Sequence, residues 1–349
     1  MKALRDLFGT ELPIIQAPMA GVQASALTIA VSNAGGLGSL PAAMLGRDAL
    51  RAELTAVRAG TSRPFNVNFF CHAPPEPSGE REARWREALA PYFAEHGIDP
   101  SQLPPGPGRA PFDAAAADLL EELRPAVVSF HFGLPAEPLL ARVRRTGARV
   151  LASATTLAEA LWLEARGVDA VIAQGLEAGG HRGSFLPEEP AYAQLGTFAL
   201  VPQLVAALRL PVIAAGGVAD ARGVAAALAL GASGVQVGTA YLLCPEATTT
   251  PLHRAALASE AARVTAVTNL FTGRPARGIV NRLMRELGPI SSLVPEFPLA
   301  TTAIAALRAK AESQGKRDFS PHWAGQNTSG CKAVPAASLT RELAGALAG

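Results

Sequence analysis

The sequence predicts an α/β protein that folds as a TIM (β/α)8 barrel, with a smaller helical region after the last barrel strand. Apolar runs of strand length alternate with helical periodicity about eight times along the chain. Glycines and polar residues follow several of these strands, at the end where such barrels place their chemistry. A doubly wound sheet would need a glycine-rich fingerprint after the first strand. That strand is followed by Ala17-Pro18-Met19-Ala20 instead, so the barrel is favoured.

The strand–helix units can be placed in order along the chain. The expected strands are short apolar segments within 12–20, 38–40, 65–70, 126–132, 149–154, 170–173, 211–215 and 234–238. The expected helices have apolar residues at helical spacing and lie at 24–33, 47–58, 113–123, 138–146, 157–166, 198–208 and 220–230.

Three segments depart from this alternation. The barrel itself is expected at 1–244. Within it, residues 72–111 are rich in Pro and Gly around one charged helix at 80–95, which indicates an excursion from the core that forms a lid or rim. Residues 245–300, with helical pieces around 252–263 and 278–286, are expected to form a substrate or lid region over the mouth. Residues 301–349 are expected to form helices that pack back on the barrel.

Composition excludes several classes of protein. With 49% hydrophobic and 17% charged residues, the chain is typical of a globular protein with a large core. A net charge of +2 without a basic block gives no case for nucleic acid. No signal peptide or charge-free membrane span is apparent, so we expect a cytoplasmic protein with no membrane partner. Cys71, Cys244 and Cys331 lie outside metal-ligand spacing and predict reduced thiols and no metal site.

The central candidate for chemistry is the segment 170–183. A buried strand ends at Gln174, and the loop that follows carries Gly179, Gly180 and His181. A histidine at the carboxyl end of a barrel strand titrates near neutral pH and can act as a base or hold an anion. The alternative is a flexible connection with a solvated histidine, and this segment alone does not decide between the two.

Two further loops predict a ligand that bears phosphate. Gly216-Gly217 follow the seventh strand and lead into a helix, and Gln236-Val237-Gly238-Thr239 follow the eighth. Glycines allow the backbone to approach a phosphate, and helix N-terminal amides supply donors. Either loop alone is compatible with an ordinary turn, but these are the two loops that commonly bind phosphate in such barrels.

The remaining polar strand ends suit a flat heteroaromatic ring. The amides of Asn68 and Gln174 can donate to and accept from the edge of an isoalloxazine, and the backbone at Ala17–Met19 can lie against it. A sugar phosphate would call for more charged groups on these strands. FMN is therefore the favoured ligand.

These motifs resemble those of the nitronate monooxygenase family, formerly called 2-nitropropane dioxygenases. The resemblance covers nearly the whole chain and is most specific in G-G-H-R-G followed by Q-V-G-T. Its motifs are Q-A-P-M at 16–19, N-V-N at 66–68, S-F-H-F-G at 129–133, Q-G-x-E-A-G-G-H-R-G at 174–183, A-G-G-V at 215–218, G-A-x-x-V-Q-V-G-T at 231–239, F-T-G-R-P-A-R-G at 271–278 and W-A-G-Q at 323–326.

The resemblance implies a barrel that binds FMN without covalent attachment. Such an enzyme would oxidise alkyl nitronates with O2 to a carbonyl compound and nitrite, by way of a flavin semiquinone or reduced flavin. His181 matches the active-site histidine of the family. The expected cofactor-binding residues are Ala17, Pro18, Met19, Asn68, Gln174, Gly179, Gly180, Gly216, Gly217, Gln236, Val237, Gly238 and Thr239.

One departure from the family pattern concerns the substrate pocket. Members often carry paired tyrosines in a P-x-Y-P…Y element, whereas this chain has Phe297 and Thr301 at those places. The size and polarity of the pocket therefore stay open.

The roles of individual side chains follow from this expectation. His181 would hold the nitronate oxygens, as imidazolium or as an N–H donor, or act as a base on neutral nitroalkane. His131 is either a substrate-binding wall of the pocket or a buried histidine bonded to backbone. Glu177 and Arg182 are expected to pair, and Tyr241 to lie in the core. The histidines expected to be solvated on loops and rims are His72, His96, His253 and His322.

Two other functions remain open from the sequence. The first is an NAD(P)H-dependent FMN reductase of quinones or enoyl thioesters on the same barrel. The second is a flavin-binding protein without turnover, although the intact His181 loop argues against it. The sequence leaves the physiological substrate open, as well as the choice between monomer and homodimer.

Overall fold

The computed structural model describes residues 2–103, 108–187 and 194–347. Eight parallel strands form its centre, in the spatial order β1-β9-β8-β6-β5-β4-β3-β2. A parallel bridge between Ile15 and Leu37 joins the two ends of this order, so the sheet closes into the predicted TIM barrel. The strands are β1 (Ile14–Gln16), β2 (Gly38–Pro41), β3 (Phe65–Phe70), β4 (Val127–His131), β5 (Arg149–Ala154), β6 (Ala170–Gln174), β8 (Val212–Ala215) and β9 (Gly234–Val237).

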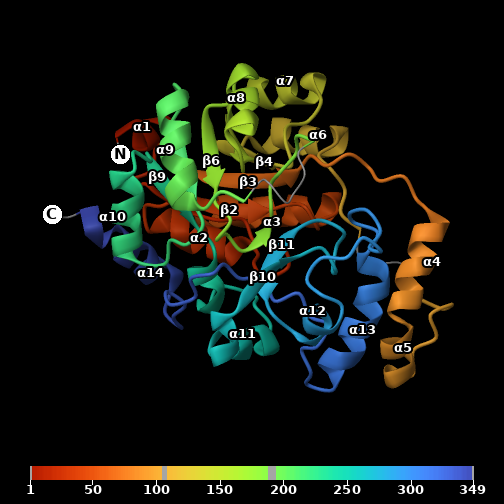
Figure 1. Cartoon of the computed structure of the whole chain (residues 1–349). Helices are drawn as coiled ribbons and strands as arrows, with labels where there is room; N and C mark the ends of the chain where they lie inside the picture. The colour runs from red at the N-terminus through yellow and green to blue at the C-terminus, as the bar shows by residue number, and fades with distance from the viewer. Residues whose placement is uncertain (1, 104–107, 188–193, 348–349) are drawn as a thin grey trace.

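Helices surround the barrel, and the last one comes from the C-terminus (Figure 1). After β9 the chain leaves through the short η1 (Thr239–Leu243), and α14 (Ala336–Leu343) returns to pack against α2 and α10. The buried hydroxyls of Tyr241 and Thr340 lie 2.9 Å apart at this contact, which confirms Tyr241 as a core residue. The helices that follow strands are α2 (Ser25–Asn33), α3 (Arg47–Gly60), α6 (Ala114–Leu123), α7 (Glu137–Arg145), α8 (Leu157–Ala165), α9 (Thr197–Ala207) and α10 (Ala221–Ala229).

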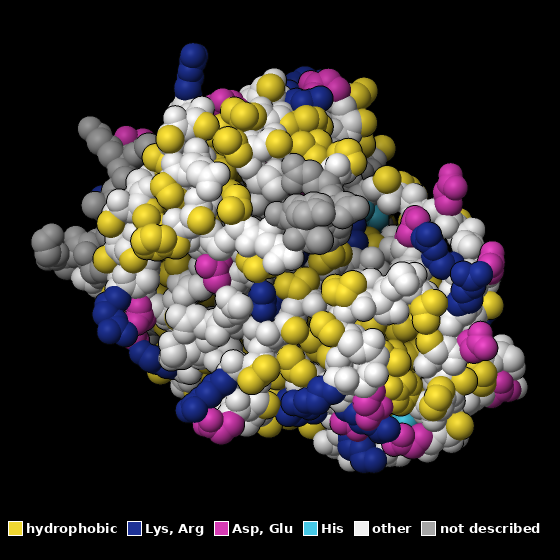
Figure 2. All heavy atoms as spheres, viewed as in Figure 1, with side chains coloured by type: hydrophobic (Ala, Val, Ile, Leu, Met, Phe, Trp, Pro, Cys, Tyr) yellow, Lys and Arg dark blue, Asp and Glu magenta, His cyan; other side chains and the backbone are white. Residues whose placement is uncertain are grey.

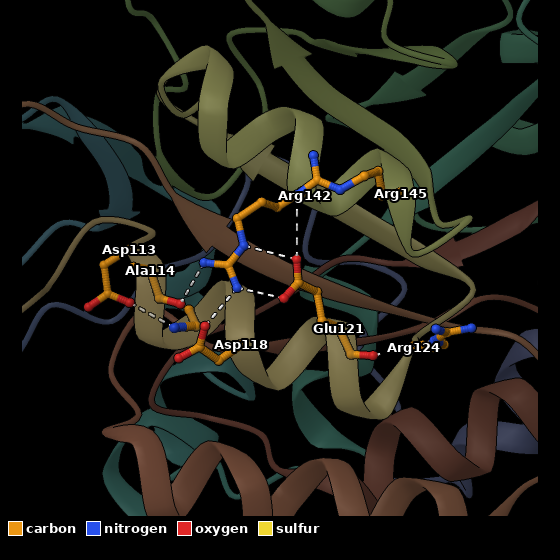
Figure 3. Close-up of polar contacts among 8 residues, drawn as sticks. Asp113, Ala114, Asp118, Glu121, Arg124, Arg142 and Arg145 are labelled. Atoms are coloured by element: carbon orange, nitrogen blue, oxygen red, sulfur yellow. Dashed lines mark hydrogen bonds and ion pairs between the residues drawn. The ribbon is translucent and has the colours of Figure 1, made fainter.

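Neighbouring outer helices are joined by ion pairs where their flanks face solvent. Between α6 and α7, the guanidinium of Arg142 donates to Asp118 at 2.6 Å and to both carboxylate oxygens of Glu121 at 2.6 and 2.9 Å (Figure 3). Asp113 caps α6 by accepting from the amide of Ala116 at 2.8 Å. These contacts fix the outer layer and lie outside the cleft described below.

The amino end of the barrel is covered by α1 (Lys2–Phe8). Leu4 and Phe8 of α1 join a buried cluster with Val127 and Ala170, which begin their strands. Since apolar side chains fill this end, the opposite, carboxyl end is left for binding.

A second hydrophobic core lies beside the barrel. It combines α4 (Gly79–Ala88) and α5 (Ala90–His96) with α13 (Thr301–Ser313), which lie together in Figure 1. The single helix expected at 80–95 is therefore wrong, because Pro91 lacks the N–H that a continuous helix needs there. We call residues 72–103, 108–111 and 264–323 the cover.

A small antiparallel sheet connects the cover to the barrel. Its order is β10 (Thr265–Thr268), β11 (Ala276–Ile279) and β7 (Gly180–His181), and His181 pairs with Ala276. The helical piece expected at 278–286 is corrected, because its start belongs to β11 and only α12 (Arg282–Glu286) is helical. The piece at 252–263 divides into α11 (Pro251–Leu257) and the short η2 (Glu260–Arg263).

The two halves of the molecule also differ at the surface. Figure 2 shows hydrophobic side chains gathered over the end that carries α9, whereas charged side chains of both signs mark the end that carries α4 and α5. Phe198 on α9 is 75% exposed. Within the described ranges, no helix combines the length and the apolar character that crossing a membrane requires.

Candidate active site

A cleft opens at the carboxyl end of the barrel and is roofed by the cover. Its empty volume is about 1380 Å³, open solvent included. Every expected site residue except Val237 lines this cleft. The side chain of Val237 packs in the hydrophobic core instead. The expected residues that line the cleft are Ala17, Pro18, Met19, Asn68, His131, Gln174, Gly179, Gly180, His181, Gly216, Gly217, Gln236, Gly238 and Thr239.

The loop after β8 depends on glycine. Gly216 has φ +116° and Gly217 has φ +74°, a region that side chains rarely adopt. A Cβ on Gly216 would meet the hydroxyl oxygen of Thr197 at 2.9 Å and the amide nitrogen of Ala178 at 3.0 Å. The bare backbone is therefore required to bring this loop so close to its neighbours along the cleft.

One amide in the first turn of α10 is used within the helix cap. The carboxylate of Asp220 caps the helix and accepts from the amide of Gly223 at 2.8 Å. That amide is therefore already bonded within the protein.

This edge of the cleft is tied down by residues near the C-terminus, which the sequence identified only through the W-A-G-Q motif. The amide of Gly325 donates to the Thr239 hydroxyl at 2.9 Å, and Asn327 donates to the Gly217 carbonyl at 2.9 Å. A Cβ on Gly179 would lie 2.5 Å from the Gly325 nitrogen. The loops after β6, β8 and β9 are thus clamped together by one segment.

The amide side chains of the barrel divide into two kinds. Asn68 donates to the hydroxyl of Ser129 at 2.9 Å, so that nitrogen is held by the barrel. Gln236, which faces the cleft, has a buried side-chain oxygen with no hydrogen-bond partner among the described residues. An unpaired buried acceptor at a cleft indicates a site for a ligand donor.

His131 and Gln174 hold the backbone of the histidine loop. The Nε2 atom of His131 lies 3.1 Å from the carbonyl oxygen of His181, and Gln174 donates to the same oxygen at 2.9 Å. Because a carbonyl only accepts, His131 carries its proton on Nε2, and Nδ1 faces the Ser153 hydroxyl at 3.1 Å. Burial lowers the pKa of His131 to about 4. The structure therefore supports the histidine bonded to backbone, with both ring nitrogens engaged.

His181 is a neutral imidazole enclosed by aromatic rings. Its pKa lies well below 6.5, chiefly because of burial and then because of the positive charges of Arg109 and Arg274. Its Nε2 atom lies 2.9 Å from the hydroxyl oxygen of Thr272 in the cover. A charged imidazolium that holds an anion is thus disfavoured, and an N–H donor or a neutral base remains.

The cover forms one wall of the cleft in segments that the sequence predicted as lids, but the sequence did not predict which side chains lie beside His181. Phe297 lies 5.4 Å from His181 between ring centroids, and Trp323 lies 5.5 Å away. Phe70 at the end of β3 and Arg109 from the excursion also line this part of the cleft. Arg109 has no motif around it in a Pro/Gly-rich stretch, so no pattern in the sequence selects it.

The other four histidines are buried, which corrects the expectation that they are solvated. His72 and His96 are packed against Phe297 and Phe319, respectively. His253 and His322 stack with their ring centroids 4.7 Å apart, and burial lowers their pKa values to about 4 and about 3. Loop position in the sequence did not reveal that the cover encloses them.

The expected pair between Glu177 and Arg182 is replaced by bonds to the surrounding structure. Glu177 accepts from the amide of Thr197 at 2.8 Å and so fixes the start of α9. Arg182 donates to the carbonyl oxygens of Gln174 and Gly175 at 3.0 and 2.7 Å. Both side chains shape the loop after β6.

Cys71, Cys244 and Cys331 are free thiols.

Comparison with known proteins gives one consistent family. The sequence profile described as nitronate monooxygenase matches residues 1–345. Nitronate monooxygenases of Paraburkholderia phytofirmans and Pseudomonas aeruginosa are each 46% identical to this chain over 98% of its length, and the matches cover 94% and 98% of those proteins.

Solved structures with the same fold are also similar in sequence. The nitroalkane oxidase from Streptomyces ansochromogenes superposes with a TM-score of 0.88 at 40% identity, over 99% of this chain and 98% of that one. FabK from Thermotoga maritima superposes with a TM-score of 0.71 at 27% identity, over 97% of this chain and 94% of that one.

Proposed function

Because the chain belongs to the nitronate monooxygenase family, we propose that it oxidises alkyl nitronates with O2 to a carbonyl compound and nitrite, using FMN in the cleft. The observation that carries this proposal is the meeting of the glycine loops, the barrel amides and His181 around one cleft. Flavin chemistry is common to the family.

The cleft residues fit FMN on two counts. At the edge formed by Gly216, Gly217 and Thr239, bare backbone is available for a phosphate. Gln236 offers an unpaired acceptor, and a Cβ on Gly180, which lines the same cleft, would meet nothing within 4 Å. Open space and an unpaired polar group in one cleft suit a flat ring with donors at its edge. A bound flavin would supply the redox chemistry, taking electrons from the nitronate and passing them to O2.

The hydrogen bond of His181 leaves one ring nitrogen for the substrate. Thr272 lies beside Nε2, and its hydroxyl also reaches the carbonyl oxygen of Arg274 at 3.4 Å. When Thr272 donates to that carbonyl, its oxygen accepts from Nε2–H, and the lone pair of Nδ1 is free. Nδ1 can then take the proton of a neutral nitroalkane. A preformed nitronate requires no proton transfer to His181.

The rings around His181 exclude water from the reacting group. Phe70, Phe132 and Phe297 place their centroids 6.1, 6.0 and 5.4 Å from that of His181. They surround the imidazole with apolar surface, which suits a small alkyl chain.

The test starts from the purified protein. We expect a yellow protein whose flavin is released by heat or acid and has the mass of FMN. Ethylnitronate added anaerobically should bleach the flavin, and with O2 each turnover should yield one nitrite. Bleaching by NADH within seconds, with no nitrite from nitronate, would instead establish the reductase. Colourless protein that cannot be reconstituted with FMN would exclude both. Light scattering on the same sample distinguishes monomer from homodimer.

A further inference from the structure

Arg109 brings a positive charge into the cleft from the Pro/Gly-rich excursion. Its Nη1 atom donates to the hydroxyl of Thr301 at 3.2 Å, and its guanidinium carbon lies 5.8 Å from the centroid of the Phe297 ring. The side chain is half-buried and lines the cleft together with His181. Phe297 is therefore in contact range of both the arginine and the imidazole.

This charge lacks a carboxylate partner in the part of the chain that the structure describes. The interactions found for its guanidinium are those with Thr301 and Phe297, and its charged neighbour is another cation, Arg308. By contrast, Arg142 and Arg282 on the surface each contact two or more carboxylates. Burial lowers the pKa of Arg109, but a guanidinium stays protonated at neutral pH. A desolvated cation without a counterion favours binding of an anion.

The other groups beside the cleft do not supply that charge. His181 is neutral for the reasons given above. Arg274 is not one of the residues that line the cleft. Its guanidinium carbon lies 4.2 Å from the centroid of Phe132, and it donates to the carbonyl oxygen of Ser184 at 3.5 Å. Of these three groups, Arg109 alone is both charged and exposed to the cleft.

We propose that Arg109 binds the anionic nitro group of the substrate and thereby selects the nitronate over the neutral nitroalkane, with His181 limited to hydrogen bonding or proton transfer. This inference rests on the proposed function and assigns its charge selectivity to one residue. Thr301 stands where family members often carry a tyrosine. It contributes to the proposed anion site, because its hydroxyl accepts the hydrogen bond from Arg109. A planar guanidinium also matches two oxygens on one atom, as in a nitronate.

The test separates binding from chemistry. Propanoate has the planar, singly charged shape of ethylnitronate but is not oxidised, so calorimetric titration of the holoenzyme with propanoate measures the anion site alone. The Arg109→Gln variant should weaken propanoate binding and raise KM for ethylnitronate by about 10- to 100-fold, the usual range for a hydrogen bond to a charged group. Its kcat on ethylnitronate and its kcat/KM on nitroethane should change little. The Arg109→Lys variant should lie between Gln and wild type.

Two controls make the result decisive. The Arg84→Gln variant removes an exposed arginine of α4 that pairs with Glu80 of the same helix, so propanoate affinity and KM for ethylnitronate should match wild type. Flavin content and Tm of each variant show whether its fold is retained, and Arg109→Lys keeps the comparison available if Arg109→Gln does not fold. Wild-type affinity for propanoate and ethylnitronate in both Arg109 variants would overturn the inference. Arg109-dependent propanoate binding without any nitronate turnover would instead overturn the proposed function and retain the anion site.

Discussion

The two sides of the cleft are built in different ways. The barrel side consists of strand ends and glycine loops, where Gly216 and Gly217 lie bare against the cleft and Gln236 offers an amide. The cover side consists of long side chains on irregular backbone such as Arg109, and Phe297 packs against the guanidinium of Arg109. A glycine edge suits a constant group such as a phosphate, whereas side chains of different charge and size suit selection of a substrate. We infer that the barrel side binds the cofactor and the cover side determines specificity.

His181 belongs to both sides. In sequence it follows β6 of the barrel, but in the structure it forms β7 and pairs with β11 of the cover. Its carbonyl oxygen is held by His131 and Gln174 from the barrel, and its ring is held by Thr272 from the cover. Substitutions on each side should therefore affect different measurements, and three of them test this division.

The largest effect is expected on the barrel side, for Gly216→Asp. The φ of +116° disfavours any side chain, and a carboxylate at this edge would repel the phosphate. We expect purified protein without flavin and without activity, but with the circular dichroism of a folded barrel. Gly46→Asp is the matched control, because a Cβ there meets nothing within 4 Å and the residue caps α3. Stoichiometric flavin in Gly216→Asp would place the phosphate elsewhere.

The next effect is expected where the two sides meet, for His181→Asn. If His181 is the base, turnover of neutral nitroethane should fall by about 10²–10⁴-fold. Preformed ethylnitronate needs no base, so its turnover should fall much less. Because the pKa of His181 is lowered, wild-type activity on nitroethane should persist as pH drops below 6.5. Unchanged kinetics on both substrates would remove His181 from the active site.

A smaller effect is expected on the cover side, for Thr272→Val. The change removes the hydroxyl beside Nε2 and leaves the barrel side intact. We expect kcat on nitroethane to fall by about 3- to 10-fold, the usual value of a neutral hydrogen bond, with unchanged flavin affinity. Thr272→Ser retains the hydroxyl and should behave as wild type. Loss of flavin from Thr272→Val would show that the two sides are not separable.

A fourth prediction concerns acid stability rather than the division between the two sides. His253 and His322 have pKa values near 4 and 3 in the folded protein and near 6.5 when unfolded. The unfolded chain therefore binds more protons, and stability falls as pH drops from 6.5 toward 4, by up to about 1.4 kcal/mol per pH unit for each histidine. The double variant His253→Phe/His322→Phe should show a shallower fall of Tm with pH. An equal fall in variant and wild type would contradict this account.

The sequence by itself determined the barrel and the barrel side of the cleft. Strand runs such as 170–173 and the glycines at 216–217 are local signals, because a buried strand needs apolar residues and a tight loop needs bare backbone. Once the strands were counted, their carboxyl ends had to meet, which brought Asn68, Gln174, His181 and Gln236 together.

Only the tertiary structure decided the cover side. Arg109 and Thr272 are far apart in sequence and carry no periodic signal, and α13 reaches its place through contacts with α5. Pairing of β7 with β11 and enclosure of His72 and His322 depend on long-range packing. The pKa of His181 follows from that enclosure and from charges supplied by distant segments, because desolvation and Coulombic fields act through space and not along the chain.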